Sequence, residues 1–352
     1  MATVTQVKTI SNPTGQETTL VSSFAKTKVG TIQSDDKDDL SEPSLIDGLW
    51  IIPTFQDKYA ERQWAKEHMA GAFRFLAKKG YIDGAGGHIS LRDPVRQDCF
   101  WINPYSVHFG MLKASDMILV DEQGQAITQT EYKVNRAGFM IHAALHKARP
   151  DIHAAVHTHS PYGRAWSVFG RPVEMLNQGM ELISSTTNGD QWYADMVHPD
   201  TDCCYFYNDL SVYDGYGGVV LGQEEGERIA QALGPRNKSV ILQNHGYVFD
   251  HEHAYVREPN RRVTQSDLVH TRLMTCGGTV DEAVAYFHAL EQACQAQILA
   301  ESAAAKGCQK RLIHDAEASF TKEGVGNAAV MFSQFKPEYQ MLLKETAGEF
   351  CE

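Results

Sequence analysis

The spacing of apolar and polar residues predicts alternating helices and strands. From Thr54 to Lys79 the two kinds of residue recur at helical spacing, and Gly80 ends that helix. Shorter apolar runs at Phe100–Asn103 and Met117–Asp121 predict strands. Further helices are expected at Val134–Ala148, Gly226–Leu233 and Asp281–Ala305. Strands that alternate with helices indicate a layered α/β or α+β domain.

Two histidines follow one apolar run directly. Ile152–Val156, interrupted only by His153, leads into His157, Thr158 and His159. Residues two apart in a strand point to the same side, so both imidazoles can aim at one point. This is half of a metal site, because neutral imidazole is a common ligand of zinc. The alternative is a chance pair on a strand or loop.

A second apolar run supplies a third candidate ligand. Val240–Leu242 leads to His245, and Gly246 then allows a sharp turn. Three histidines with an open fourth position are typical of a catalytic metal site rather than a structural one.

Composition narrows the class of protein. The 352 residues suffice for one large domain or two small ones, and the formal net charge of -12 argues against non-specific binding to nucleic acid or anionic membranes. Seven scattered cysteines suggest reduced thiols in an intracellular protein. No apolar run approaches the roughly 20 residues of a membrane span, and residues 1–8 lack an apolar signal core. We therefore expect a cytoplasmic protein.

The ends of the chain differ from its middle. Residues 1–42 are rich in Ser, Thr, Asp and Lys, which predicts a disordered arm. Residues 43–310 are expected to form the main domain, followed by an extension at 311–352. The glycine-rich stretch 84–90 is interpreted either as a backbone cradle for an anion or as an ordinary helix-to-strand turn.

Several motifs, in this order, resemble the class II aldolase/adducin family. The resemblance covers about residues 55–305 and is carried by these stretches: Gly87–Pro94, Ile102–Pro104, Asp116–Asp121, Arg149–Asp151, His157–His159, Asn244–Gly246, Gly278–Ala283 and Leu290–Cys294. Within the family, Phe100–His108 and Ser160–Ser167 are similar to an adducin-like branch found in fungi and bacteria.

The resemblance implies a three-layer α/β/α fold around a mainly antiparallel sheet. It implies a divalent metal on His157, His159 and His245, usually zinc, with Mn²⁺ or Fe²⁺ as alternatives. Family enzymes use the ion to polarise a carbonyl and hold an enediolate, in aldol cleavage or epimerisation of small hydroxy-carbonyl substrates. Active members are typically homotetramers.

One departure from the family pattern concerns the general base. Family aldolases carry Glu, and epimerases Asp, four residues before a helical histidine that matches His142, but this chain has Gly138 there. His142, His88 and His108 are candidates for a replacement base, and each is also explained as a packed or capping histidine. His88 also stands where the aldolases have Asn, so a phosphorylated substrate is not implied.

The remaining candidate site residues come from the matched motifs. Those expected to contact substrate are Gly87, Ser90, Asn103 and Ser106. Tyr162 is a candidate proton donor, and Arg164 a candidate partner for an acidic group. The alternative function is a non-catalytic, adducin-like module that binds a cytoskeletal partner such as actin, and the missing carboxylate at Gly138 favours it. A weaker third interpretation is a damaged gene product.

Two segments, about 179–201 and 247–272, interrupt the resemblance. Back-translation of Gly179-Met180 and Gly246–Val248 allows splice-donor sequences, and Thr201-Asp202 and Arg272 allow acceptors. We therefore hypothesise that both segments are retained introns. The alternative is a pair of surface loops, which cost little closure entropy.

Overall fold

The computed structural model describes most of the chain. The described residues are 6–11, 17–22, 45–46, 49–82, 84, 86–177, 203–215, 223–243 and 272–352.

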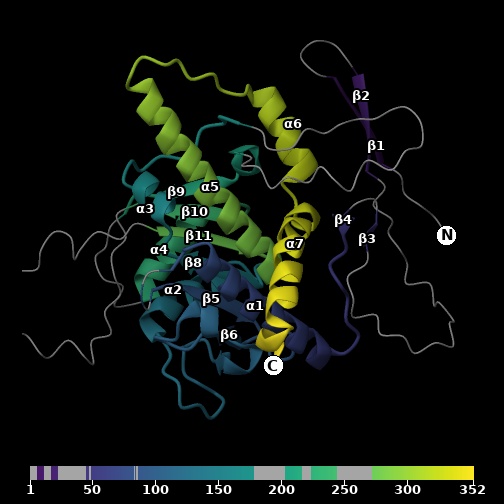
Figure 1. Ribbon diagram of the computed structural model, residues 1–352, viewed down its shortest axis with the longest axis vertical. Helices are drawn as coiled ribbons and strands as arrows, with labels where there is room; N and C mark the ends of the chain where they lie inside the picture. The colour runs from purple at the N-terminus through teal and green to yellow at the C-terminus, as the bar shows by residue number, and fades with distance from the viewer. Residues whose placement is uncertain are drawn as a thin grey trace, which may run out of the picture.

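A seven-stranded sheet forms the centre of the molecule (Figure 1). Its strands, in spatial order, are β7 (Ile118–Val120), β6 (Phe100–Ile102), β5 (His88–Arg92), β8 (Ala154–Thr158), β11 (Arg272–Gly277), β10 (Ser239–Leu242) and β9 (Leu210–Tyr213). Every neighbouring pair is antiparallel except β10 and β9, which are parallel. The predicted mainly antiparallel sheet is thus confirmed.

Helices cover both faces of this sheet. One face carries α1 (Lys58–Lys78), α5 (Val280–Ala304) and α7 (Ala328–Thr346), and the other carries α2 (Arg136–Ala148) and α4 (Gln223–Leu233) (Figure 1). The helices begin at polar caps: the side chain of Asp57 accepts from the Tyr59 N–H, and that of Thr279 accepts from the Glu282 N–H. These layers confirm the three-layer α/β/α fold.

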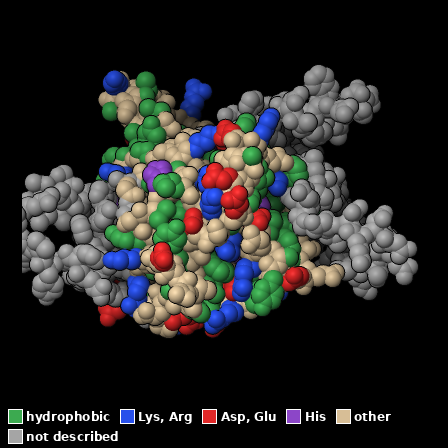
Figure 2. Space-filling model, turned by 60° about the horizontal axis from the view of Figure 1, so that its bottom comes forward, with side chains coloured by type: hydrophobic (Ala, Val, Ile, Leu, Met, Phe, Trp, Pro, Cys, Tyr) green, Lys and Arg blue, Asp and Glu red, His purple; other side chains and the backbone are tan. Residues whose placement is uncertain are grey.

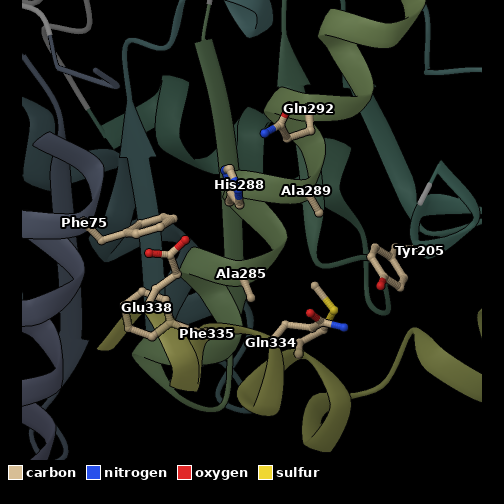
Figure 3. Close-up of a pocket in the computed structure, with 10 residues that line it drawn as sticks. Phe75, Tyr205, Ala285, His288, Ala289, Gln292, Gln334, Phe335 and Glu338 are labelled. Atoms are coloured by element: carbon tan, nitrogen blue, oxygen red, sulfur yellow. The ribbon is translucent and has the colours of Figure 1, made fainter. Parts of the chain in front are cut away.

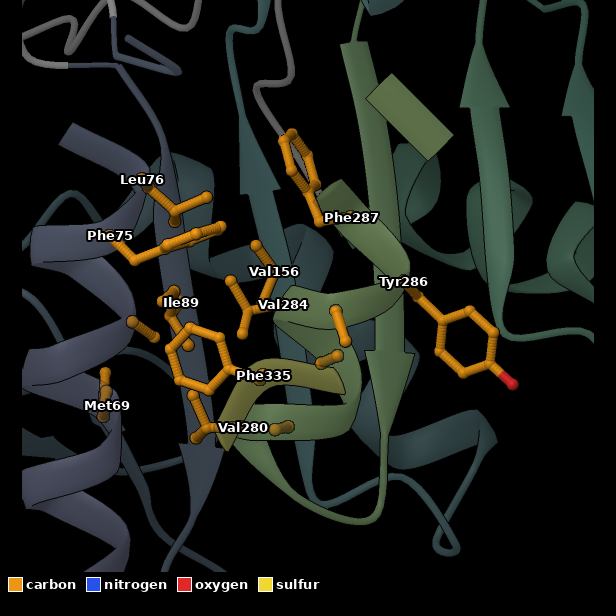
Figure 4. Close-up of a cluster of buried hydrophobic side chains, with 14 of the residues drawn as sticks. Met69, Phe75, Leu76, Ile89, Val156, Val280, Val284, Tyr286, Phe287 and Phe335 are labelled. Atoms are coloured by element: carbon orange, nitrogen blue, oxygen red, sulfur yellow. The ribbon is translucent and has the colours of Figure 1, made fainter. Parts of the chain in front are cut away.

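The core lies between the sheet and the first helix layer. Val156 and Ile89 from the sheet meet Phe75 of α1, Val284 of α5 and Phe335 of α7 (Figure 4). Apolar burial here provides the main stabilisation. On the opposite face a smaller cluster joins the sheet to α2 and α4.

Strand β8 is central in the sheet, and its side chains alternate between the two faces. This alternation positions His157 in the candidate site. Ala154 and Val156 point into the larger core, while Ala155 points toward α2 and α4. His157 follows the second set, so its imidazole lies between the sheet and α2.

The C-terminal residues pack onto this body. Helix α6 (Asp315–Val325) precedes α7, and a final turn, η6 (Glu349–Cys351), places the Glu352 carbonyl 2.9 Å from the Ser115 N–H. Within the N-terminal 50 residues the structure describes strands only. They form two pairs: β1 (Gln6–Ser11) with β2 (Glu17–Ser22), and β3 (Leu45–Ile46) with β4 (Leu49–Trp50). The predicted domain boundaries stay predictions.

The two predicted inserts fall almost wholly outside the described residues, but their flanks lie side by side. The Cys203 N–H donates to the Asn177 carbonyl at 3.2 Å. Leu242, near the end of the described part of β10, is paired across the sheet with Arg272, where β11 begins. The residues that flank each segment are therefore neighbours in the structure.

The visible surface has mixed charge. Lys, Arg, Asp and Glu side chains are interspersed with apolar ones over the face in Figure 2. No helix in the described ranges is both long and apolar enough to cross a membrane.

Candidate functional site

The structure brings the two histidines at the end of β8 together. The ring centroids of His157 and His159 are 5.9 Å apart, and both side chains are buried. His157 Nδ1 lies 3.0 Å from the Leu273 carbonyl, which can only accept a hydrogen bond. Nδ1 of His157 therefore carries the proton, and in the neutral ring the lone pair lies on Nε2. A backbone carbonyl that fixes the tautomer in this way is typical of metal-ligating histidines.

The turn after His159 is held by Glu291 of α5. Its carboxylate accepts hydrogen bonds from the Ser160 hydroxyl, from the Tyr162 N–H at 2.7 Å and from the Gly163 N–H at 2.6 Å. These N–H groups belong to the first turn of α3 (Pro161–Ser167), where a carboxylate is favoured. Burial raises the pKa of Glu291, and the three hydrogen bonds oppose that rise. The direction of the chain at His159 is thus fixed from a distant helix.

The glycine loop before β5 lies against this turn. A Cβ atom on Gly86 would stand 2.7 Å from Nδ1 of His159, so only glycine fits there. Gly87 has a φ of +100°, which also favours glycine. Residues 83 and 85 lie outside the described part of the chain, so the anion cradle stays a prediction.

The structure separates the three candidates for a replacement base. His108 caps the turn η1 (Phe109–Met111), with its Nδ1 accepting from the Gly110 N–H at 3.1 Å. The His88 ring packs against Gly138, where an added Cβ would lie 2.8 Å from its Nε2. Any side chain at position 138 would collide with His88, so the two departures from the family pattern are in contact.

His142 lies in a chain of buried polar groups. Its Nδ1 is 2.7 Å from the Ser90 hydroxyl, which is also 2.8 Å from His146 Nε2. Burial lowers the pKa of His142 to about 3 and that of His146 well below its usual range. Both rings are therefore neutral. The ring of His142 is 5.9 Å from that of His88 and 6.4 Å from that of His157.

The remaining candidate residues differ in their burial and in their place in the fold. Asn103 is buried, and its Oδ1 has no hydrogen-bond partner among the described residues. Ser106 is exposed with a φ of +62°, and Tyr162 is 36% exposed in the first turn of α3. His245 lies outside the described residues.

The described residues include donor groups suited to a metal ion, but they do not form a complete metal site. Histidines 157 and 159 are neighbouring imidazoles, and the buried Nε2 of His142 has no hydrogen-bond partner in the described ranges. Within those ranges, no three His, Cys, Asp or Glu side chains converge closely enough to hold an ion. Further donors must therefore come from elsewhere if the pair binds a metal.

Two cavities lie away from the pair His157 and His159. One, of about 50 Å³, lies between α5 and α7, and its lining includes His288, Gln292, Phe335 and Glu338 (Figure 3). It has room for a water molecule or two. The second, of about 160 Å³, is lined by Trp64 and other residues near the opposite end of the sheet. The histidine pair lines neither cavity.

Sequence reasoning missed two residues of this region. Glu291 lies within the matched stretch Leu290–Cys294, but no local pattern signals its contact with a turn 131 positions earlier in the chain. His146 carried a usable signal, because it follows His142 by one helical turn and therefore shares its face of α2.

Comparison with known proteins identifies relatives over most of the chain. Residues 67–254 match the model of the class II aldolase and adducin N-terminal domain. The meiotically up-regulated gene 14 protein of Schizosaccharomyces pombe is 33% identical over 85% of this chain and 96% of its own. The 4-hydroxy-3-prenylphenylpyruvate oxygenase/4-hydroxy-3-prenylbenzoate synthase of Streptomyces roseochromogenus is 31% identical over 84% of this chain and 88% of its own. Among solved structures, the L-fuculose 1-phosphate aldolase of Glaciozyma antarctica is 32% identical, with a TM-score of 0.65, over 85% of this chain and 96% of its own.

Proposed function

The chain belongs to the class II aldolase/adducin family, and from this premise we propose that it is a metal-dependent enzyme acting on a small hydroxy-carbonyl substrate. The reaction is the cleavage or formation of a carbon–carbon bond beside the carbonyl, with epimerisation as the alternative. The pairing of His157 with His159, and the carbonyl that fixes the His157 tautomer, carry this proposal.

The proposed ligands are His157, His159 and His245. The first two are imidazole side chains at and just after the end of β8, and both are buried. His245 follows β10, and the end of β10 lies at the same edge of the sheet, because Leu242 pairs with Arg272 and the next residue of β11 pairs with Thr158. Imidazole ligands favour Zn²⁺, with Fe²⁺ or Mn²⁺ as alternatives. A bound ion would polarise the carbonyl and stabilise negative charge on its oxygen.

The chain's own side chains orient the reactants. Glu291 holds the turn that carries His159, and we assign His142 the role of accepting a hydrogen from the substrate. Because the pKa of His142 is lowered to about 3, its ring is a hydrogen-bond acceptor rather than a strong base. Tyr162, half-exposed beside the His159 turn, is the proposed proton donor.

The names of two relatives support carbon–carbon chemistry. One is an aldolase, and the other is an oxygenase named for an arylpyruvate, which is a 2-oxo acid. Both named compounds contain a carbonyl group. An oxidative cleavage with Fe²⁺ is therefore the main variant of the proposal.

A second candidate function is a non-catalytic binding module of the adducin type. Gly138 favours this function, because the carboxylate expected at that position is absent. The His88 ring also leaves no room for a side chain there. In that case no described histidine would need to bind metal, and the partner would be a protein such as actin.

The proposed function is tested by activity and metal content together. Protein from a clone that matches the sequenced cDNA is loaded with Zn²⁺ or Fe²⁺ and incubated with L-fuculose 1-phosphate, with dihydroxyacetone plus an aldehyde, and with an arylpyruvate under oxygen. We expect turnover of at least one substrate. His159→Ala should lose metal and turnover together. His153→Ala, a matched control at the exposed residue just before the same strand, should keep both. Turnover that survives in metal-free His159→Ala protein would refute the proposal.

The family also suggests an oligomer. Exposed apolar side chains just after α3, at Val168 and Phe169, and on α5, at Leu299, are candidates for a contact between copies. Light scattering coupled to gel filtration would measure the assembly, for which we propose a tetramer.

A further inference from the structure

Three buried side chains and one carbonyl form a hydrogen-bonded series behind the histidine pair. The Ile152 carbonyl is 3.1 Å from His146 Nδ1, and His146 Nε2 is 2.8 Å from the Ser90 hydroxyl. The same hydroxyl is 2.7 Å from His142 Nδ1. Ser90, His142 and His146 are all shielded from solvent, so water does not compete for these bonds.

The direction of each hydrogen bond follows from its chemistry. A carbonyl only accepts, so Nδ1 of His146 carries a proton and donates to Ile152. The neutral His146 ring then has no proton on Nε2, which must accept from the Ser90 hydroxyl. Because Ser90 has only one proton, its oxygen accepts from Nδ1–H of His142. The neutral His142 ring is therefore left with a lone pair on Nε2.

No described residue donates a hydrogen to that lone pair. Nε2 of His142 is buried and has no hydrogen-bond partner among the described residues. Its ring stands edge-on to the rings of His88 and His157, at 5.9 and 6.4 Å between centroids. A buried acceptor without a donor costs free energy, so among the described residues this nitrogen is left open to a hydrogen from a ligand.

We propose that Ser90 and His146 are positioning residues that hold His142 in its Nδ1–H tautomer, so that Nε2 accepts a hydrogen bond from a hydroxyl group of the bound substrate. This rests on the proposed function for the identity of the ligand. It assigns Ser90 to the support of His142 rather than to direct contact with substrate. It also narrows the substrate to molecules with a hydroxyl close to the metal-binding carbonyl or carboxylate.

The tautomer is tested directly by NMR. Long-range ¹H–¹⁵N correlation on ¹⁵N-histidine-labelled, metal-free protein reports which ring nitrogens carry protons, and loss of a signal in His142→Gln assigns the ring. We expect a proton on Nδ1 of His142 and none on Nε2. In Ser90→Ala, whose folding is checked by circular dichroism, the proton should move to Nε2. In the control Ser167→Ala, which removes another buried hydroxyl that donates to the Arg164 carbonyl, the tautomer should stay. A proton on Nε2 in the wild type would overturn the inference.

The ligand is tested with two matched probes on zinc-loaded protein. Glycolate and methoxyacetate both offer a carboxylate and a second oxygen, but only glycolate has a hydroxyl hydrogen. The wild type should bind glycolate about 3- to 10-fold more tightly, the gain typical of one hydrogen bond. In Ser90→Ala this preference should fall below about 2-fold. An equal preference in both proteins would overturn the assignment of the hydroxyl, and so would a change in the Nε2 signal that reports direct coordination to the metal.

These experiments separate failure of the proposed function from failure of the role proposed for Ser90 and His146. If the wild type binds neither metal nor probe, the proposed function fails. The tautomer of His142 in the metal-free protein then still decides whether Ser90 and His146 act as positioning residues.

Discussion

Acid should unfold this protein through its buried histidines. Burial lowers the pKa of His142 to about 3 and that of His288 to about 4, and it lowers the pKa of His146 as well. In the unfolded chain each titrates near about 6.5. Because the folded values are depressed, the neutral rings contribute stability above about pH 6.5 that is lost as the pH falls toward the folded values.

The magnitude follows from the gap between folded and unfolded values. Each such histidine costs about 1.4 kcal/mol for every pH unit below about 6.5. At pH 5 this gives roughly 2 kcal/mol for His142 and somewhat less for the partly exposed His288, and His146 adds in the same direction. A loss of about 4 kcal/mol or more is a large share of the 5–15 kcal/mol typical of folded proteins.

The assay is urea unfolding of chelator-treated protein from pH 7.5 to 5. Metal is removed because an ion would compete with protons for the same nitrogens. His288→Gln is the matched variant. It cannot titrate, and it keeps a polar group near the Tyr81 hydroxyl, so its stability should fall less steeply by about 1.4 kcal/mol per pH unit. A wild-type free energy of unfolding that changes by less than about 1 kcal/mol over this range would refute the reasoning.

Three further predictions concern the His159 turn, the far end of the sheet and the two segments. Glu291→Ala should lower the free energy of unfolding by about 2–3 kcal/mol, because two N–H groups of the His159 turn lose their acceptor. It should also weaken zinc binding about 10-fold or more. A folded variant with unchanged zinc affinity would contradict this. Asp93→Asn should lower the free energy of unfolding by about 2–4 kcal/mol, because it breaks the paired hydrogen bonds from Arg62. It should leave the zinc affinity unchanged, and urea unfolding together with a zinc titration measures both effects. Messenger RNA should lack the codons for 179–201 and 247–272, and the shorter chain should be more stable by about 2 kcal/mol per shortened loop; transcripts that keep both segments would end the intron hypothesis.

The intron hypothesis predicts a short connection between β10 and β11. Without 247–272, Gly246 would precede Leu273 directly and would take the place opposite Leu242. The connection between β10 and β11 would then be the three residues 243–245, a common hairpin length. His245 would lie in that short turn, at the same end of the sheet as His157.

Local signals in the sequence predicted much of the fold. The helical period from Thr54 to Lys79 and the stop at Gly80 match α1, because periodicity and capping act within a few residues. The paired His157 and His159 were also predicted, since alternation in a strand is local. These features need no knowledge of distant contacts.

The rest depends on contacts between distant parts of the chain. Glu291 reaches the His159 turn from α5, and Ser90 joins two histidines of α2. The exclusion of a side chain at Gly138 by His88 joins a strand to a helix. Sequence alone showed the two departures from the family pattern separately, and only the packing shows that they are neighbours.

The most direct test of the central claim is the metal content of each chain, measured by mass spectrometry on protein purified without chelator from a cDNA-verified clone. We predict about one zinc, iron or manganese ion per chain in the wild type and in His153→Ala, and its loss in His157→Ala. Folded wild-type protein with no bound metal would contradict the claim and favour the adducin-like binding module.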